Sequence, residues 1–242
     1  MVGLTGVERG DYTGGMSILL FDIDGTLIRT SGAGKSAMEA ALAGVFAVTE
    51  LRDEVSYSGR TDPAIGLDLL RVHGIDPTDA HNDLLHSAYL QHLPTSLERF
   101  GGTVLPGIRE VMGLLHGHPD VRLGLLTGNS YHGAQAKLMH FGLWHYFRFG
   151  GFGDGRHDRD DVARDALAAA QQYLNGPVDP ETVYVIGDTP LDIRCARAIG
   201  AKAVAVATGW HPRSELAEHQ PDWLFDDFSQ ASELVALWLG VR

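Results

Sequence analysis

Short, uninterrupted apolar runs are the feature that most limits how this chain can fold. They recur at residues 17–21, 121–126, 183–186, 203–207 and, more weakly, 223–225. Continuous rather than alternating hydrophobicity is typical of strands covered on both faces, as in a parallel sheet. Between these runs, apolar residues recur at helical spacing over residues 107–115, 131–141 and 160–173. The alternation predicts an α/β fold with a doubly wound, mainly parallel, Rossmann-like sheet.

One long interval interrupts this alternation. Residues 32–103 contain no convincing strand, only helical stretches at 33–48, 61–72 and 78–93, which end near Gly or Pro residues such as Pro94. The interval is too long for a crossover connection. We therefore expect an inserted α-helical cap domain at 32–103 and an α/β core formed by 16–31 and 104–242. Residues 1–15, rich in Gly and polar residues, are expected to form a disordered lead.

Charge and cysteine content limit the partners and the compartment. The chain has 19 Lys and Arg against 31 Asp and Glu, a net charge of −12, and no basic run. Such a surface repels nucleic acid and anionic lipid, so neither is an expected partner. The single cysteine, Cys195, favours a reducing compartment, and no apolar stretch is long enough to span a bilayer. We expect a cytoplasmic protein.

The strongest chemical signal is FDIDGTL at residues 21–27, directly after the first apolar run. Carboxyl ends of parallel strands form the ligand crevice, so Asp22 and Asp24 are expected to face it, with Gly25 letting the chain turn away. Asp22 is the candidate nucleophile towards phosphorus. Asp24 is the candidate general acid and base. The alternative, a turn-forming Asp-Gly pair, is common in proteins.

Two further strand ends carry polar residues. LLTGN at 125–129 ends the second strong run, and a hydroxyl with backbone N–H groups at Thr127, Gly128 and Asn129 suits phosphate oxygens. Thr127 as a helix cap is the alternative. VIGDTPLD at 185–192 ends the third strong run and predicts Asp188 as a metal ligand. Asp192 is either a further ligand or part of a capping box with a threonine.

The expected convergence of Asp22, Asp24, Asp188 and Asp192 requires a compensating cation, because like charges so close cannot all stay ionised. Oxygen ligands, waters and a substrate phosphate favour Mg²⁺. The ion would offset repulsion between the carboxylate nucleophile and an anionic phosphate.

These motifs resemble, in order, those of the haloacid dehalogenase superfamily of aspartate-nucleophile phosphatases, over nearly the whole chain after Met16. The resemblance implies a Mg²⁺-dependent phosphatase that works through an aspartyl phosphate, with Asp24 giving the metal its backbone carbonyl. The family also uses a basic residue, usually Lys followed by Pro, in a third motif. No Lys occurs in GRHDRDD at 155–161, and the spacing favours Arg159. Arg156, Arg164 and Lys137 are its rivals for this role.

Within the expected cap, SGRTD at 58–62 resembles the segment with which phosphoglycolate phosphatases and β-phosphoglucomutases present cap residues to substrate. Arg60 and Lys35 are candidates to meet an anionic group of the substrate, with surface salt bridges as the alternative. Trp210 and His211 follow the fourth strong run, and packing is favoured over a place at the rim of the crevice.

The resulting hypothesis is a phosphatase acting on a small-metabolite phosphomonoester, either phosphoglycolate-like or a sugar phosphate. The alternatives are a sugar phosphomutase, a metal-independent haloacid dehalogenase and a non-catalytic binding domain. The partner would be a small phosphorylated metabolite, and the chain a monomer or a homodimer; the sequence does not name the substrate.

Overall fold

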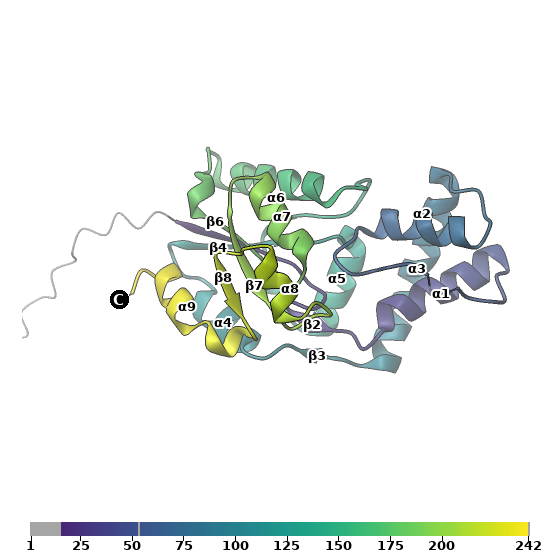
Figure 1. Ribbon diagram of the computed structural model, residues 1–242, viewed down its shortest axis with the longest axis horizontal. Helices are drawn as coiled ribbons and strands as arrows, with labels where there is room; N and C mark the ends of the chain where they lie inside the picture. The colour runs from purple at the N-terminus through teal and green to yellow at the C-terminus, as the bar shows by residue number, and fades with distance from the viewer. Residues whose placement is uncertain (1–15, 53, 242) are drawn as a thin grey trace, which may run out of the picture.

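Six parallel strands form the central sheet of the computed structural model, which describes residues 16–52 and 54–241 (Figure 1). The expected lead at 1–15 lies outside the described residues. The strand order is β5-β4-β1-β6-β7-β8. The strands are β1 (Ser17–Phe21), β4 (Val121–Leu126), β5 (Phe149–Gly151), β6 (Val183–Gly187), β7 (Lys202–Val206) and β8 (Trp223–Phe225). The predicted doubly wound α/β fold is confirmed.

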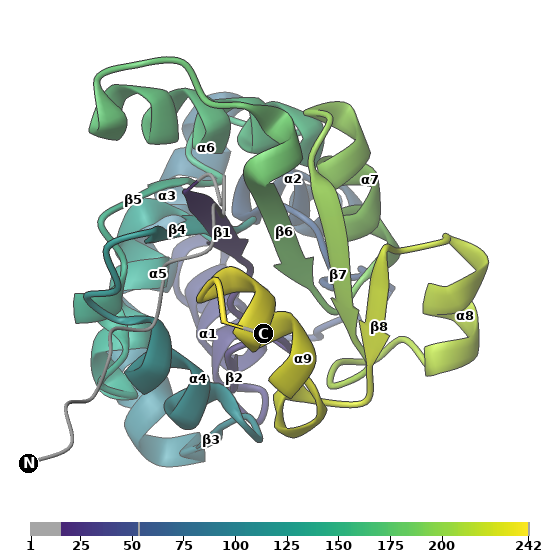
Figure 2. The ribbon, with the colours of Figure 1, turned by 90° about the vertical axis from the view of Figure 1, so that its left-hand side faces the viewer.

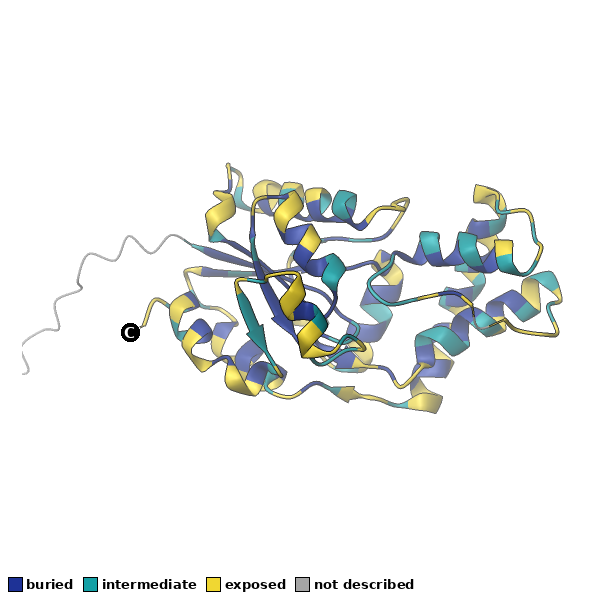
Figure 3. Ribbon diagram, in the orientation of Figure 1, coloured by how far each residue is buried: buried dark blue, intermediate teal, exposed yellow. Residues whose placement is uncertain are grey.

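Helices cover both faces of this sheet (Figure 2). Leu19 and Phe21 of β1 pack with one helical layer, and Ile18 and Leu20 pack with the other, so the strand is buried throughout (Figure 3). The first layer contains α4 (Ile108–Leu115), α5 (Tyr131–His140) and α9 (Ser232–Trp238). The second contains α6 (Arg159–Leu174), α7 (Pro190–Ala198) and α8 (Arg213–Glu218). Burial on both faces explains the uninterrupted apolar runs.

A helical insert lies between two short strands, β2 (Ile28–Arg29) and β3 (Thr103–Val104), which pair antiparallel. It consists of α1 (Ala33–Phe46), α2 (Asp62–Val72) and α3 (Asp79–Phe100) and stands to one side of the sheet (Figure 1). The three helices have their own apolar core. Thr61 and Thr78 cap α2 and α3 with their side-chain oxygens, which fixes where these helices begin.

Helix α3 is longer than predicted. The expected end before Pro94 is wrong, since the helix continues through this proline to Phe100 and ends at Gly101, where φ is 65°. Leu93 and Leu97 are buried in the core of the insert on either side of the proline. Their packing offsets the missing hydrogen bond of the proline. Among the described helices, none is both long and apolar enough to cross a membrane.

Candidate active site

The candidate residues follow three neighbouring strands. β1 lies between β4 and β6, and Phe21 is in register with Leu125 and Ile186. Asp22, Thr127 and Asp188 each come directly after one of these strands. The parallel sheet therefore brings three segments far apart in sequence to a single edge.

Asp22, Asp188 and Asp192 form a buried acidic cluster, in which one carboxylate oxygen from each lies within 4.8 Å of the others. Burial raises the pKa of Asp22 to about 6 although the charge of Arg159 lowers it. Burial and the charges of Asp192 and Asp22 raise the pKa of Asp188 well above its usual value. Three carboxylates thus face a single arginine, Arg159, and the hard oxygen donors of the cluster suit a divalent cation.

Glycines surround Asp188 closely. A Cβ atom at Gly25, where φ is +85°, or at Gly209 would collide with the Asp188 carboxylate. The hydroxyl of Thr26 donates a hydrogen bond of 3.1 Å to Asp188 Oδ1. Only glycine gives the main chain this close approach to the acidic cluster, so the sequence DIDGT shapes the site as well as supplying its carboxylates.

Asp192 fits both interpretations offered by the sequence. It forms the capping box of α7, because its Oδ2 accepts from the Thr189 N–H at 3.0 Å while its own N–H donates to the Thr189 hydroxyl oxygen at 3.3 Å. Its Oδ1 lies 2.6 Å from Nη2 of Arg159. Asp192 therefore caps a helix, belongs to the acidic cluster and anchors a cation.

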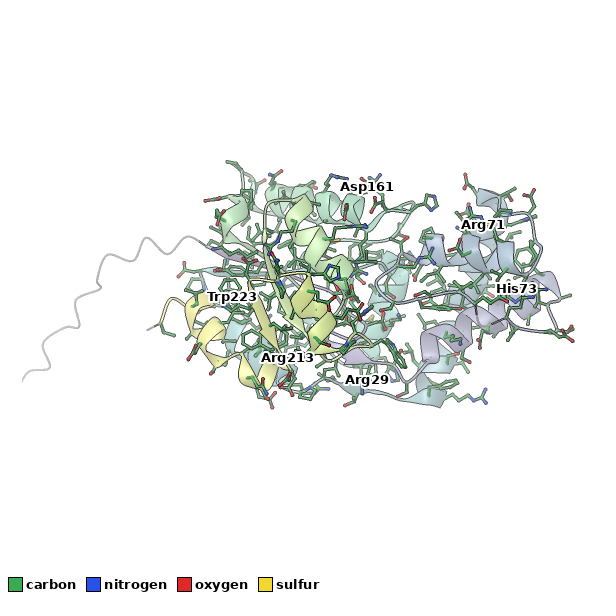
Figure 4. The ribbon with its side chains drawn as sticks, in the orientation of Figure 1. Arg29, Arg71, His73, Asp161, Arg213 and Trp223 are labelled. Atoms are coloured by element: carbon green, nitrogen blue, oxygen red, sulfur yellow. The ribbon has the colours of Figure 1, made fainter. Side chains whose placement is uncertain are left out.

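Arg159, at the start of α6, is the arginine that reaches the nucleophile candidate. Its Nη2 lies 2.8 Å from Asp22 Oδ1, and its side chain is 4% exposed. Arg156 instead pairs with Asp165 on the surface. Arg164 pairs with Asp161, which lies at the outer side of α6 (Figure 4). Of the three arginines weighed for the third motif, only Arg159 contacts the acidic cluster in the described residues.

Lys137, the fourth candidate for the basic residue of the third motif, contacts the carboxylate of Asp24. Its Nζ is 2.6 Å from both Asp24 Oδ2 and Asn129 Oδ1, and its side chain is 7% exposed. Asn129 Nδ2 donates to Asp24 Oδ2 at 2.9 Å. Sequence reasoning missed this second buried cation as a partner of Asp24. The only available signal was a lysine on the buried face of the helix that follows the second motif.

The Thr127 hydroxyl lies in the loop after β4 and does not cap the next helix. Ser130, not Thr127, caps α5 by accepting from the Gly133 N–H at 3.3 Å. Thr127 is fully buried, and its Oγ1 accepts from the side-chain amide of Asn129 at 2.9 Å. The helix-cap alternative for Thr127 is therefore wrong. Gly128 lies against the insert, because a Cβ atom there would collide with the carbonyl oxygen of Arg60.

Arg60 and Lys35, the insert residues expected to contact the substrate, instead form ion pairs with other residues of the insert. The guanidinium of Arg60 is 2.6 Å from Asp68 and also donates to the carbonyl of Ala64. Lys35 lies 3.8 Å from Glu39. The structure thus does not place either cation on the acidic cluster.

Packing, the interpretation favoured for Trp210, is wrong, because its side chain is 90% exposed. Its neighbour His211 contacts Ser58 of the insert, with 3.2 Å between Nε2 and Oγ. Arg29 of β2 donates to the carbonyl of Thr208 in the same loop at 2.7 Å (Figure 4).

A buried carboxylate thus follows the first parallel strand, an acidic pair follows a neighbouring strand, and Arg159 bridges Asp22 and Asp192 in this α/β protein. The chain belongs to the haloacid dehalogenase-like hydrolases, whose family pattern it matches over residues 16–200. The resemblance seen in the sequence is confirmed, and the protein is an enzyme of this family.

Curated relatives span nearly the whole chain. The probable phosphatase IndB of Dickeya dadantii is 28% identical over 219 residues, covering 88% of this chain and 90% of its own. A phosphoglycolate phosphatase of Rhodobacter capsulatus is 27% identical over 224 residues, covering 91% and 97%. The crystal structure of CbbY from Rhodobacter sphaeroides in complex with phosphate superposes with a TM-score of 0.73 at 22% identity, covering 89% and 96%. This structural likeness shows a shared fold.

Proposed function

We propose that this protein is a Mg²⁺-dependent phosphatase that hydrolyses a small-metabolite phosphomonoester through an aspartyl phosphate on Asp22. The observation that carries the proposal is the environment of Asp22: a buried carboxylate at a strand end, 2.8 Å from Arg159 and within the acidic cluster. The names of the curated relatives support the reaction class.

The residues suit both halves of the reaction. An Asp22 oxygen attacks phosphorus, a new O–P bond forms, and the bond from phosphorus to the ester oxygen breaks. Asp24 gives its proton to the departing oxygen. Asp24 then takes a proton from the water that attacks the aspartyl phosphate, which releases inorganic phosphate and restores Asp22.

The donors of the acidic cluster fit Mg²⁺. Asp22 and Asp188, with the backbone carbonyl of Asp24 and with Asp192 in direct contact or one layer out, would hold the ion. When bound, the ion supplies positive charge against the phosphate and the buried carboxylates. Thr127, Gly128 and Asn129 hold phosphate oxygens with their hydroxyl and N–H groups, and Arg159 orients Asp22 and neutralises charge.

The helical insert acts as the cap, and its residues 58–62 lie against the loop that would hold phosphate. A cap that closes over the substrate excludes bulk water until the aspartyl phosphate is ready for attack. The substrate is a small phosphorylated metabolite, for which 2-phosphoglycolate is the first candidate because several relatives carry its name.

The test is phosphate release by the purified protein from a panel of metabolite phosphates, with Mg²⁺ and with excess chelator. We expect Mg²⁺-dependent release that chelator abolishes. Transfer of label between two positions of a hexose phosphate would instead indicate the mutase. Inertness towards the whole panel would overturn the proposal.

A further inference from the structure

A second buried cation has no part in the mechanism described so far. Lys137 projects from α5, and the residue is 5% exposed. A buried lysine is rare unless it is paired. Burial lowers its pKa, but the charges of Asp24 and Asp62 outweigh this and raise the pKa above its ordinary value. The ammonium therefore stays charged, and its partners should explain why it is there.

Lys137, Asn129 and Asp24 form a closed triangle of hydrogen bonds. The ammonium lies 2.6 Å from both Asp24 Oδ2 and Asn129 Oδ1, and the Asn129 amide closes the triangle by donating to Asp24 Oδ2 at 2.9 Å. Two donors on one oxygen fix the rotamer of an aspartate side chain that is still 40% exposed. The triangle leaves Asp24 open to a substrate while restricting where its carboxylate lies.

The ammonium is placed differently from the guanidinium of Arg159. Arg159 bridges Asp22 and Asp192, at 2.8 and 2.6 Å. Lys137 contacts Asp24, which is not one of the three residues of the acidic cluster. The two aspartates of the first motif thus have separate cations. Of these two aspartates, Lys137 contacts Asp24 and not Asp22, so it acts on the proton-transfer partner and not on the nucleophile.

The helical insert contacts the two residues on either side of Asn129 through Asp62, the first residue of α2. The backbone N–H of Asp62 donates to the carbonyl of Gly128 at 2.8 Å, and its Oδ2 accepts from the Ser130 N–H at 2.8 Å. Asp62 is 9% exposed, and its charge interacts with that of Lys137. The insert therefore places a buried carboxylate on the loop that carries Asn129.

We propose that Lys137 is the positioning residue for Asp24, and that Asp62 of the insert supports it by holding the loop that carries Asn129. The inference rests on the proposed function, in which Asp24 protonates the leaving oxygen. Its consequence is selective. Loss of Lys137 impairs phosphoryl transfer from esters whose leaving oxygen needs a proton and spares esters whose leaving group departs as a stable anion.

Two esters separate these cases. The leaving group of 2-phosphoglycolate is an alkoxide that requires a proton, whereas p-nitrophenyl phosphate loses a stabilised phenolate. For both, kcat/KM reports the steps up to formation of the aspartyl phosphate. General acid catalysis contributes roughly 10²–10⁴-fold, so we expect Lys137→Met to lower kcat/KM for 2-phosphoglycolate at least about tenfold more than for p-nitrophenyl phosphate.

Two further variants sharpen the test. Asp62→Asn should give the same selectivity with a smaller loss, and it serves as the deciding variant if Lys137→Met does not fold. Lys202→Met is the matched control, since this half-buried lysine of β7 lies 3.9 Å from Glu181 and, among the described residues, contacts none of the candidate site. We expect it to leave both rates unchanged.

Each outcome of these measurements either supports the inference or overturns it. A selective loss in Lys137→Met or Asp62→Asn supports the inference. An equal loss of kcat/KM for both esters with a raised KM would show that Lys137 binds the phosphate. Unchanged rates would show that Lys137 has no role. Either result would overturn this inference but not the proposed function. A wild-type protein that releases phosphate from neither ester would overturn the proposed function as well.

Discussion

Asp22 and Asp24 are two residues apart in sequence, yet their surroundings differ sharply. Asp22 is buried with two other carboxylates and Arg159, whereas the Asp24 side chain is 40% exposed beside Lys137. In the proposed mechanism, these different surroundings would allow Asp22 to serve as a nucleophile and Asp24 as a proton carrier. The local sequence contains both acids, but only the fold assigns a separate cation to each.

We expect repulsion within the acidic cluster to lower the stability of the folded protein when no cation is bound. Asp188→Asn keeps the shape of the side chain and removes one of three close charges. We expect the metal-free variant to melt a few degrees higher than wild type at pH 7.5, since about 1 kcal/mol shifts Tm by roughly 2–4 °C in a domain of this size. Its phosphatase activity should fall at least about 100-fold.

Asp222→Asn is the control for this stability measurement. Asp222 accepts hydrogen bonds from the Ala203 N–H and from Arg197, both at 2.7 Å, so removing its charge should lower Tm. An Asp188→Asn protein that melts below wild type and is still stabilised by Mg²⁺ would contradict the account of the cluster.

At the scale of elements, the contact between the insert and the β4–α5 loop requires glycine at position 128. A Cβ atom there would collide with the Arg60 carbonyl, a backbone atom that cannot rotate away. Gly128→Ala should therefore lower the free energy of unfolding by about 1–3 kcal/mol and reduce kcat/KM, measured by denaturant titration and by phosphate release.

Gly44→Ala is the matched control within the insert. Gly44 lies inside α1, and a Cβ atom added to it would meet open space, so alanine should stabilise the helix by about 0.5–1 kcal/mol. If Gly128→Ala and Gly44→Ala changed the free energy of unfolding equally, the close contact at Gly128 would not contribute to stability.

The strands that follow from sequence are those with continuous apolar runs. The sequence does not predict β5, because Phe149–Gly151 holds two glycines and no run. It forms because α6 packs tightly against it: a Cβ atom at Gly151 would collide with the Val162 carbonyl. Within the site, the spacing of the third motif predicts Arg159 as its basic residue. The contact of Lys137 with Asp24 depends on how α5 packs, and no local sequence pattern predicts that contact.

For the whole molecule, Mg²⁺ binding and protonation should compete at the acidic cluster. The raised pKa of Asp22, about 6 against 3.8, means that its contribution to stability is present at low pH and is lost as the pH rises through 6. A cation that binds the ionised cluster restores it.

The Mg²⁺-induced rise in Tm should therefore be larger at pH 7.5 than at pH 5, because binding at the lower pH must first displace protons. Paired melting curves with and without Mg²⁺ at each pH cancel the titration of all other groups. A Tm shift that is the same at both values would contradict the linkage.

Direct detection of the covalent intermediate tests the central claim. The protein would be mixed with Mg²⁺ and a phosphorylated substrate, quenched in acid within the first turnover, digested and analysed by mass spectrometry. We predict one phosphoryl group on Asp22, and none anywhere in Asp22→Asn, which should also lack turnover. Phosphate release at the normal rate without a modified Asp22, or undiminished turnover by Asp22→Asn, would contradict it.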